Sequence, residues 1–179
     1  MPTEYREEPC RAALNRVTGM DFGWSLNPYM GCEHQCTFCY VRAFERRADR
    51  PWDARYGQSI RVKVNVAEVL ARELARPSWK REMVAVGAAT DPYQPAEGRY
   101  RLTRRCLQAF AAARNPFSLI TRGPLIVRDI DVLQGASHRA EVGVTFSIPT
   151  LDQEVWSRTE IGTAHPRQRL RAVRMLVEA

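Results

Sequence analysis

The sequence predicts an α/β fold in which about five parallel strands form most of a β/α barrel. Short apolar segments rich in Val alternate with longer segments whose apolar residues recur at helical spacing. Strands separated by helices in this way pair in parallel through right-handed crossovers. In addition, the residues best suited to chemistry follow the ends of predicted strands, which is where β/α barrels place their sites.

Each predicted strand has its own signal. The first is extended and runs directly into a cysteine-rich loop, the second alternates and is rich in Val, and the third is a continuous apolar run of the kind found in buried strands. The fourth and fifth are shorter apolar segments that each follow a predicted helix. The five predicted strands are residues 24–30, 60–66, 82–89, 117–121 and 142–148.

The predicted helices lie between these strands, at residues 37–47, 67–76, 102–114, 125–134 and 166–178. Pro77 ends the second helix, because proline cannot continue it. Thr103 is a candidate cap of the third, and Gly135 is the stop signal of the fourth. Pro166 suits the first turn of the last helix, which carries an apolar stripe.

The strand and helix pattern divides the chain into an N-terminal extension, residues 1–20, and one barrel domain, residues 21–179. The last helical pattern continues to Ala179 without a closing Gly, Asn or Pro. A helix in this architecture leads to another strand. We therefore favour a C-terminally truncated chain, in which the final strand of the barrel is missing, over a natural terminal helix that frays.

The composition is that of a globular domain, with 179 residues of which 45% are hydrophobic. No apolar run approaches the roughly 18 residues that a membrane-spanning helix needs, and the chain begins without an apolar leader. These features, with only five cysteines, predict a cytoplasmic protein with reduced thiols and no membrane association.

The net charge is +7, and almost all of the positive charge comes from arginine, since Lys63 and Lys80 are the two lysines. A basic protein favours acidic partners, including nucleic acid. The arginines are spread along the chain, however, which is also typical of solvated helix faces. Both interpretations stay open at this point.

Cys32, Cys36 and Cys39 are the strongest chemical signal, with the spacing C-x3-C-x2-C directly after the first predicted strand. Three close thiolates can each bind one iron of a [4Fe–4S] cluster, which leaves the fourth iron open to a small molecule. Zinc with His34 as fourth ligand is the alternative, but four ligands within eight residues give an awkward tetrahedron. We interpret Cys10 and Cys106 as packing thiols.

Two further blocks accompany the cysteines and carry a family resemblance. Residues 27–40 read NPYMGCEHQCTFCY, residues 62–65 read VKVN and residues 87–97 read GAATDPYQPAE, with weaker matches at 121–123 and 147–148. With these blocks the chain resembles the radical SAM superfamily, and within it the branch related to spore photoproduct lyase, often labelled DNA-repair-photolyase-like. The resemblance implies a partial (β/α)6 radical SAM barrel.

The resemblance also implies the cofactors and the reaction. A [4Fe–4S] cluster would chelate S-adenosylmethionine, and reductive cleavage would yield a 5′-deoxyadenosyl radical that abstracts hydrogen from a substrate, with nucleic acid as a candidate. The cofactors carry this chemistry, while the protein supplies position and exclusion of solvent. An electron donor such as flavodoxin or ferredoxin would be the partner.

By the same resemblance, roles fall on residues at the matched positions. Phe38 would lie beside the adenine, and Tyr40 directly follows the cluster. Thr90 and Asp91 end the third predicted strand, where a carboxylate can accept charge-assisted hydrogen bonds from the cofactor's ammonium group. Both aromatic residues could instead pack at the mouth of the barrel, and Asp91 could be a turn residue.

Two more matched residues end later strands. Arg122 occupies a position where relatives carry Lys, facing the methionyl carboxylate, although the two side chains are not interchangeable. Ser147 could reach the ribose with its hydroxyl, or bond its own backbone. Glu97 lies in the matched segment 87–97 and could equally be a site residue or a structural residue.

The chain departs from spore photoproduct lyase at one informative place. That family carries a hydrogen-donating cysteine just before the positions matching Thr90 and Asp91, whereas this chain has Ala88 and Ala89. Alanine cannot donate a hydrogen atom in that way, which argues against thymine-dimer repair. The competing hypotheses are a zinc-stabilised basic nucleic-acid-binding module and a non-catalytic fragment with an open barrel.

Overall fold

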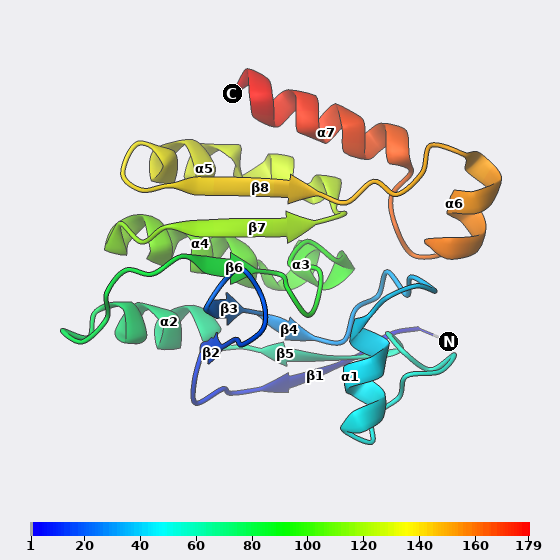
Figure 1. Ribbon diagram of the computed structural model, residues 1–179, viewed down its shortest axis with the longest axis horizontal. Coiled ribbons are helices and arrows are strands. Elements are labelled where there is room, and N and C mark those ends of the chain that lie inside the picture. Colours follow the sequence, from blue (N-terminus) through cyan, green and yellow to red (C-terminus); the bar gives the residue numbers. More distant parts are fainter. Residues whose placement is uncertain (1) are drawn as a thin grey trace.

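Two sheets, joined by one bent strand segment, organise the protein in the computed structural model, which describes residues 2–179 (Figure 1). The larger sheet has the order β2-β3-β6-β7-β8 and the smaller sheet β1-β5-β4. The strands are β1 (Glu4–Glu8), β2 (Leu14–Arg16), β3 (Trp24–Leu26), β4 (Tyr29–Met30), β5 (Ser59–Lys63), β6 (Val84–Val86), β7 (Phe117–Thr121) and β8 (Val142–Phe146).

The parallel part of the larger sheet confirms four of the five predicted strands. β3, β6, β7 and β8 pair side by side in parallel, with Leu26 opposite Val86 and Leu119 opposite Val144. Their carboxyl ends lie on the same edge, at the right of Figure 1. Residues 24–30 are split into β3 and β4 at Asn27 and Pro28, so that this segment passes from one sheet into the other.

The expected direction of the second predicted strand was wrong. β5 pairs antiparallel with β4 and parallel with the N-terminal strand β1. A parallel crossover requires a helix packed on the sheet, but α1 (Val41–Arg47), which precedes β5, buries only Val41. Within residues 2–179 the strands therefore form two sheets of mixed direction, and the predicted barrel is not closed.

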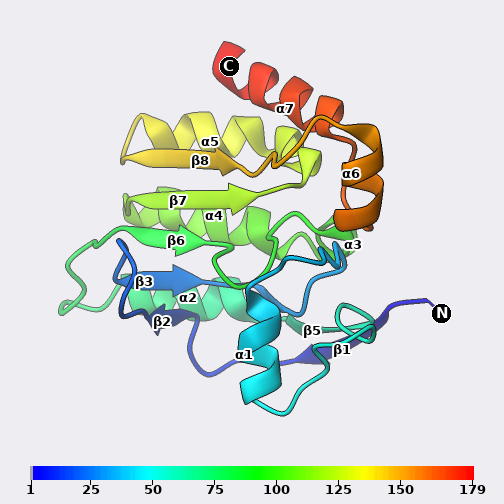
Figure 2. The same ribbon diagram turned by 45° about the vertical axis from the view of Figure 1, so that its right-hand side comes forward.

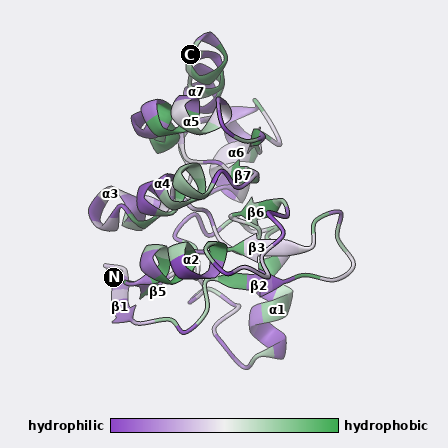
Figure 3. Cartoon of the chain, turned by 90° about the vertical axis from the view of Figure 1, so that its left-hand side faces the viewer, coloured by the Kyte–Doolittle hydropathy of each residue, from purple (hydrophilic) through white to green (hydrophobic). Residues whose placement is uncertain are grey.

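Three helices cover one face of the larger sheet, as Figure 3 shows from the side. They are α2 (Val66–Leu74), α4 (Leu102–Ala113) and α5 (Ile130–Ser137). Phe110 of α4 stacks on Phe117 of β7 with ring centroids 5.1 Å apart, and both are fully buried. Burying a side chain of this size stabilises the fold by about 1.5–3 kcal/mol.

The remaining helices lie near the carboxyl edge or at the end of the chain (Figure 2). α6 (Gln153–Thr159) was not predicted and lies close to the cysteine loop, and α7 (Pro166–Glu178) has the predicted bounds. The others are α3 (Pro95–Tyr100) and the 3-10 helix η1 (Pro124–Asp129), which precedes α5. No helix among residues 2–179 is long and apolar enough to cross a membrane.

Three predicted helix signals were wrong for local reasons. α1 begins at Val41 rather than near residue 37, because the cysteine loop occupies the preceding residues. Gly135 lies inside α5 and does not end it. Thr103 does not cap α4: its hydroxyl donates to Pro92 O, and the carboxylate of Glu97 accepts from the amides at the start of the helix.

Glu97 is a fully buried structural residue. Its carboxylate accepts hydrogen bonds from the Tyr29 hydroxyl at 2.5 Å and from the Arg128 guanidinium at 2.7 Å. Arg128 also pairs with the buried Asp129, to which Arg104 donates at 3.0 Å. These arginines are half-buried structural groups, so the interpretation of the arginines as solvated helix faces does not hold for them.

Residues of the predicted N-terminal extension take part in both sheets. β1 pairs with β5, and β2 pairs antiparallel with β3. The buried carboxylate of Glu73 in α2 accepts hydrogen bonds from the amides of Ala13 and Leu14, at 3.2 and 2.9 Å. This contact fixes the start of β2 against the helix layer.

Candidate cofactor site

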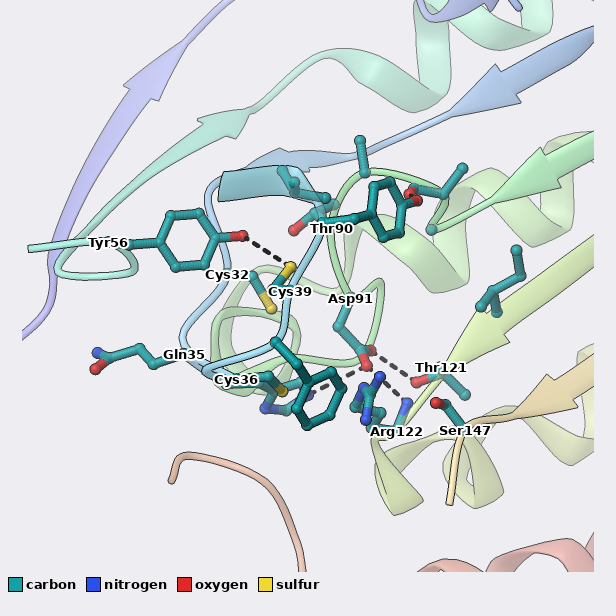
Figure 4. A pocket seen from close by; sticks show the side chains of 18 residues that line it. Cys32, Gln35, Cys36, Cys39, Tyr56, Thr90, Asp91, Thr121, Arg122 and Ser147 are labelled. Atoms are coloured by element: carbon teal, nitrogen blue, oxygen red, sulfur yellow. Dashed lines mark hydrogen bonds and ion pairs between the residues drawn. The ribbon is translucent and has the colours of Figure 1, made fainter. Parts of the chain in front are cut away.

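A cavity of about 250 Å³ lies at the carboxyl edge of the parallel strands, and all three cysteines of the loop line it (Figure 4). Its other walls come from the segments that follow β6, β7 and β8. The structure thus brings together the predicted metal and cofactor residues, whereas Glu97 lies outside this cavity. The residues brought together are Cys32, Cys36, Phe38, Cys39, Tyr40, Thr90, Asp91, Arg122 and Ser147.

Residues of the segment 87–97, which follows β6, form hydrogen bonds with the start of the cysteine loop. Gly31 has a φ of +87°, and a Cβ there would lie 2.8 Å from Ser59 O, so glycine suits this turn. Its carbonyl accepts hydrogen bonds from the Thr90 hydroxyl at 2.6 Å and from Gln94 Nε2 at 3.1 Å. Gln94 Oε1 in turn accepts from the amide of Glu33 at 3.0 Å. Thr90 is therefore engaged in shaping the loop.

The thiols are held in a poorly solvated environment. Cys32 and Cys36 are buried, and Cys39 is half-buried. Burial raises the pKa of the Cys36 thiol to about 11, and burial together with the charge of Asp91 raises the pKa of Cys32. Without a metal Cys32 and Cys36 stay protonated near neutral pH, so metal binding must release their protons.

The three thiols of the cysteine loop lie at one cavity without converging on a single point. Among residues 2–179, no group of three His, Cys, Asp or Glu side chains is placed to hold one metal ion. The three thiols nonetheless share one cavity, as expected if each binds a different iron. Cys10 is half-buried and Cys106 is fully buried in α4, outside this cavity.

His34 is buried, and each of its ring nitrogens lies close to a protein oxygen. Nδ1 lies 3.0 Å from Gly162 O, and Nε2 lies 3.2 Å from Oδ2 of Asp91. Burial alone would lower the pKa of His34, but the neighbouring Asp91 outweighs it and raises the pKa. The side chain clamps the cysteine loop to the strand ends and is poorly placed to serve as a fourth zinc ligand.

Asp91 connects three segments at the base of the cavity. Its Oδ1 accepts hydrogen bonds from the Tyr93 amide and the Thr121 hydroxyl, at 2.8 and 2.7 Å. Its Oδ2 accepts from the Arg122 amide at 2.7 Å and faces His34. Burial would raise the pKa of this carboxyl, but His34 and the hydrogen bonds from Thr121 and Arg122 hold it below the ordinary value. Asp91 is thus an ionised group that ties β6 and β7 to the loop.

Arg122 carries positive charge to the same cavity. Its guanidinium donates to Glu160 Oε1 at 2.6 Å and lies over the ring of Phe38, 5.1 Å from the centroid. Glu160 is fully buried, and its Oε1 also accepts from the fully buried Arg169 at 2.8 Å, whereas Oε2 has no hydrogen-bond partner among residues 2–179. The predicted cationic residue is therefore positioned by a buried carboxylate.

The two aromatic residues of the cysteine loop remain accessible. Phe38 is 48% exposed and Tyr40 is 54% exposed, and both line the cavity. The Tyr40 hydroxyl donates to Ala88 O, which joins the loop to the segment after β6. Ser147 also lines the cavity, and its backbone is bonded to Thr121 O and to the Arg169 guanidinium. Accessible rings beside a cavity are available for a flat ligand.

Three residues near the site gave no clear signal in the sequence. Glu160 and Arg169 lie in or beside late helices and resembled surface charges. Tyr56, in the loop before β5, has its hydroxyl 3.8 Å from Cys39 Sγ. Their contacts depend on how separate segments pack together. The sequence offers only the apolar pattern of the neighbouring helices and strands as a signal, and that pattern does not identify these three residues.

Comparisons with known proteins identify a family for most of the chain. The model of the radical SAM superfamily matches residues 26–179. Uncharacterised proteins of Mycobacterium tuberculosis and Mycobacterium bovis are each 40% identical over 169 residues, which is 93% of this chain and 50% of theirs. An uncharacterised protein of Acidianus two-tailed virus is 30% identical over 165 residues, 87% of this chain and 52% of its own. The chain thus spans about half the length of the curated relatives it matches.

Solved structures show the same fold. Spore photoproduct lyase complexed with dinucleoside spore photoproduct superposes with a TM-score of 0.73 and 16% identity, over 97% of this chain and 48% of the lyase. A mutant of that lyase with bound AdoMet and dinucleoside spore photoproduct gives the same TM-score at 17% identity and the same coverage. At 16–17% identity these structures show that the fold is shared and nothing more. The family rests on the superfamily model, which matches most of the chain. The chain belongs to the radical SAM superfamily.

Proposed function

We propose that the protein is a radical SAM enzyme that holds a [4Fe–4S] cluster through Cys32, Cys36 and Cys39 and binds S-adenosylmethionine in the same cavity. When bound, these cofactors supply reductive cleavage of the sulfonium C–S bond and a 5′-deoxyadenosyl radical for hydrogen abstraction. The observation that carries the proposal is that the three thiols share one cavity with strand-end residues of both charges.

The chain's own residues would bind and orient the cofactor. Arg122 and Asp91 present opposite charges at one cavity, which suits the carboxylate and ammonium groups of a methionyl moiety. Phe38 and Tyr40 would lie beside the adenine, and Ser147 would bond the ribose. Because Asp91 already bonds two strand ends, its larger contribution would be to keep Arg122 and His34 in place.

Thr90 would act on the loop that holds the metal. Its hydroxyl and Gln94 both bond the carbonyl of Gly31, directly before Cys32. In the proposed enzyme this contact would fix the spacing of the thiols and help to exclude water from the cavity. The segments that the relatives carry beyond the matching half would complete the barrel around it.

The proposed partners follow from the chemistry and the charge. The reaction needs one electron from a donor such as flavodoxin or ferredoxin. The net charge of +7 supports nucleic acid as a substrate candidate. Ala88 and Ala89 both line the cavity, so the chain lacks there the thiol that the lyase-type reaction would use. This supports an outcome other than thymine-dimer repair.

Anaerobic reconstitution tests the proposal directly. We expect a brown protein with about four irons per chain, and release of 5′-deoxyadenosine when dithionite and S-adenosylmethionine are added. Alanine at Cys32, Cys36 or Cys39 should abolish both, because one iron of the cluster would then lose its protein ligand. The control variant Cys106→Ala removes a thiol outside the cavity, and this variant should bind as much iron as the wild-type protein.

Two results would contradict the proposal. A colourless protein that retains zinc would favour the zinc-stabilised module. A protein that binds iron but releases no 5′-deoxyadenosine would favour the non-catalytic fragment.

A further inference from the structure

The loop between α1 and β5 packs directly on the cysteine loop and brings one aromatic side chain to a sulfur atom. Tyr56 is only 3% exposed and lines the cavity beside the cysteines (Figure 4). Its hydroxyl oxygen lies 3.8 Å from Cys39 Sγ, a distance compatible with a hydrogen bond to sulfur. Figure 4 shows the phenol pointing from the side of the cavity at this sulfur.

The ring of Tyr56 is held in this position from its other side. The Arg42 guanidinium lies over the ring, 4.5 Å from the centroid. The same guanidinium donates to the carbonyls of Gln35 and Cys36 in the cysteine loop, at 3.1 Å each, and to those of Trp52 and Asp53, at 2.8 Å each. Arg42 therefore fastens the two loops together with the ring between them.

At Gly57 the backbone of the loop before β5 lies directly against the backbone of the cysteine loop. It has a φ of +81°, and a Cβ at this position would collide with Cys32 O. The neighbouring Tyr56 amide is bonded to Asp53 O at 3.0 Å, so the turn is closed. The position of the phenol beside the sulfur is thus determined by a hydrogen-bonded turn that packs against the cysteine loop.

Once the Cys39 sulfur binds iron, the hydrogen bond between it and the Tyr56 hydroxyl can have only one direction. A thiolate has no proton, so the phenol must donate and the sulfur accept. Hydrogen bonds to the sulfurs of an iron–sulfur cluster are among the features that set its reduction potential. A donor stabilises the more negative, reduced state more than the oxidised one, because the sulfur carries more charge in the reduced state.

We propose that Tyr56 is a positioning residue of the metal site, whose hydroxyl donates a hydrogen bond to the Cys39 thiolate and makes the cluster easier to reduce. This inference rests on the proposed function, since it requires the cluster. It assigns Tyr56 a role in electron uptake rather than in contact with substrate.

The test is the reduction potential of the reconstituted cluster in Tyr56→Phe, measured by a redox titration followed by electron paramagnetic resonance. Phenylalanine keeps the ring under Arg42 and removes only the donor. We expect iron content equal to wild type and a midpoint potential shifted to a more negative value. Tyr100→Phe is the matched control, because its hydroxyl bonds Glu7 outside the cavity, and its potential should not move.

A second variant addresses the case in which Tyr56→Phe loads less iron. With 3-fluorotyrosine at position 56 the ring and hydroxyl stay, and the more acidic phenol should shift the potential in the positive direction. Iron-loaded variants with the wild-type potential would overturn the inference and leave the proposed function intact. Failure of the wild-type protein to bind iron would instead overturn the proposed function.

Discussion

At the scale of single residues, the least expected feature is the buried carboxylate of Glu160 between two arginines. Its Oε1 accepts from Arg122 and Arg169, and Arg169 is bonded further to Ser147 O and Thr163 Oγ1. Removing one partner from a buried ion pair leaves an uncompensated charge without water to solvate it. Glu160 therefore links the end of β8, the start of α7 and the cavity.

We expect Glu160→Gln to lower the free energy of unfolding by about 3–5 kcal/mol, because Arg169 would stay charged and fully buried. Urea denaturation followed by circular dichroism measures the change. The control Glu178→Gln breaks an exposed pair with Arg174 and should cost no more than about 1 kcal/mol. Equal denaturation midpoints for the two variants would show that Glu160 is not needed for stability.

The sequence predicted the residues of the site better than their contacts. The cysteine spacing and the block at 87–97 identified the cavity lining, because both are short, local patterns. The partner of Arg122 could not be predicted, since Glu160 lies 38 residues away and its burial depends on how α6 and α7 pack. For the same reason the sequence did not distinguish the buried Arg169 from an arginine on a solvated helix face.

At the scale of elements, prediction succeeded where a helix or strand buries a regular apolar face. α7 and β7 have the predicted bounds, and α4 ends one residue earlier than expected. It was wrong about the start of α1, which buries one residue, and about the direction of β5, which is set by its pairing with β1 and β4. Pairing between strands distant in sequence leaves no local signal in either strand.

The glycine inside α5 offers a test at this scale. Apart from its adjacent residues and its own helix backbone, a Cβ at Gly135 would meet no atom of residues 2–179 within 4 Å, so Gly135→Ala should raise the free energy of unfolding by about 0.5–1 kcal/mol through helix propensity alone. Thermal denaturation measures the shift. The same exchange at Gly123, where a Cβ would lie 2.5 Å from Tyr93 O, should destabilise the protein. A lower melting temperature for Gly135→Ala would show that α5 ends before this residue in solution.

At the scale of the whole molecule, the larger sheet ends in a strand that has one neighbour. Within residues 2–179, β8 pairs only with β7, and its other side faces an apolar groove formed with α5 and α7. Val144 of β8 is 36% exposed. Unpaired edges of this kind are templates for pairing with another chain.

We therefore expect this chain to self-associate as its concentration rises, and Val144→Lys to weaken that association several-fold by placing a charge on the edge. Sedimentation velocity over a concentration series measures the effect. Val155→Lys, on the exposed face of α6, serves as the control for added charge. Equal effects of the two lysines would show that β8 is not the associating edge.

The bonds that shape the cysteine loop also determine when it can form. Thr90 bonds Gly31 across 59 residues, and Gln94 bonds Glu33 across 61. Contacts of this separation close large loops of chain and form late in folding. The cysteines come early in the sequence, yet the segment that carries them reaches its final shape only after β6 has joined the sheet. A ribosome-bound chain that ends before residue 94 would therefore carry all three thiols without the geometry to hold iron.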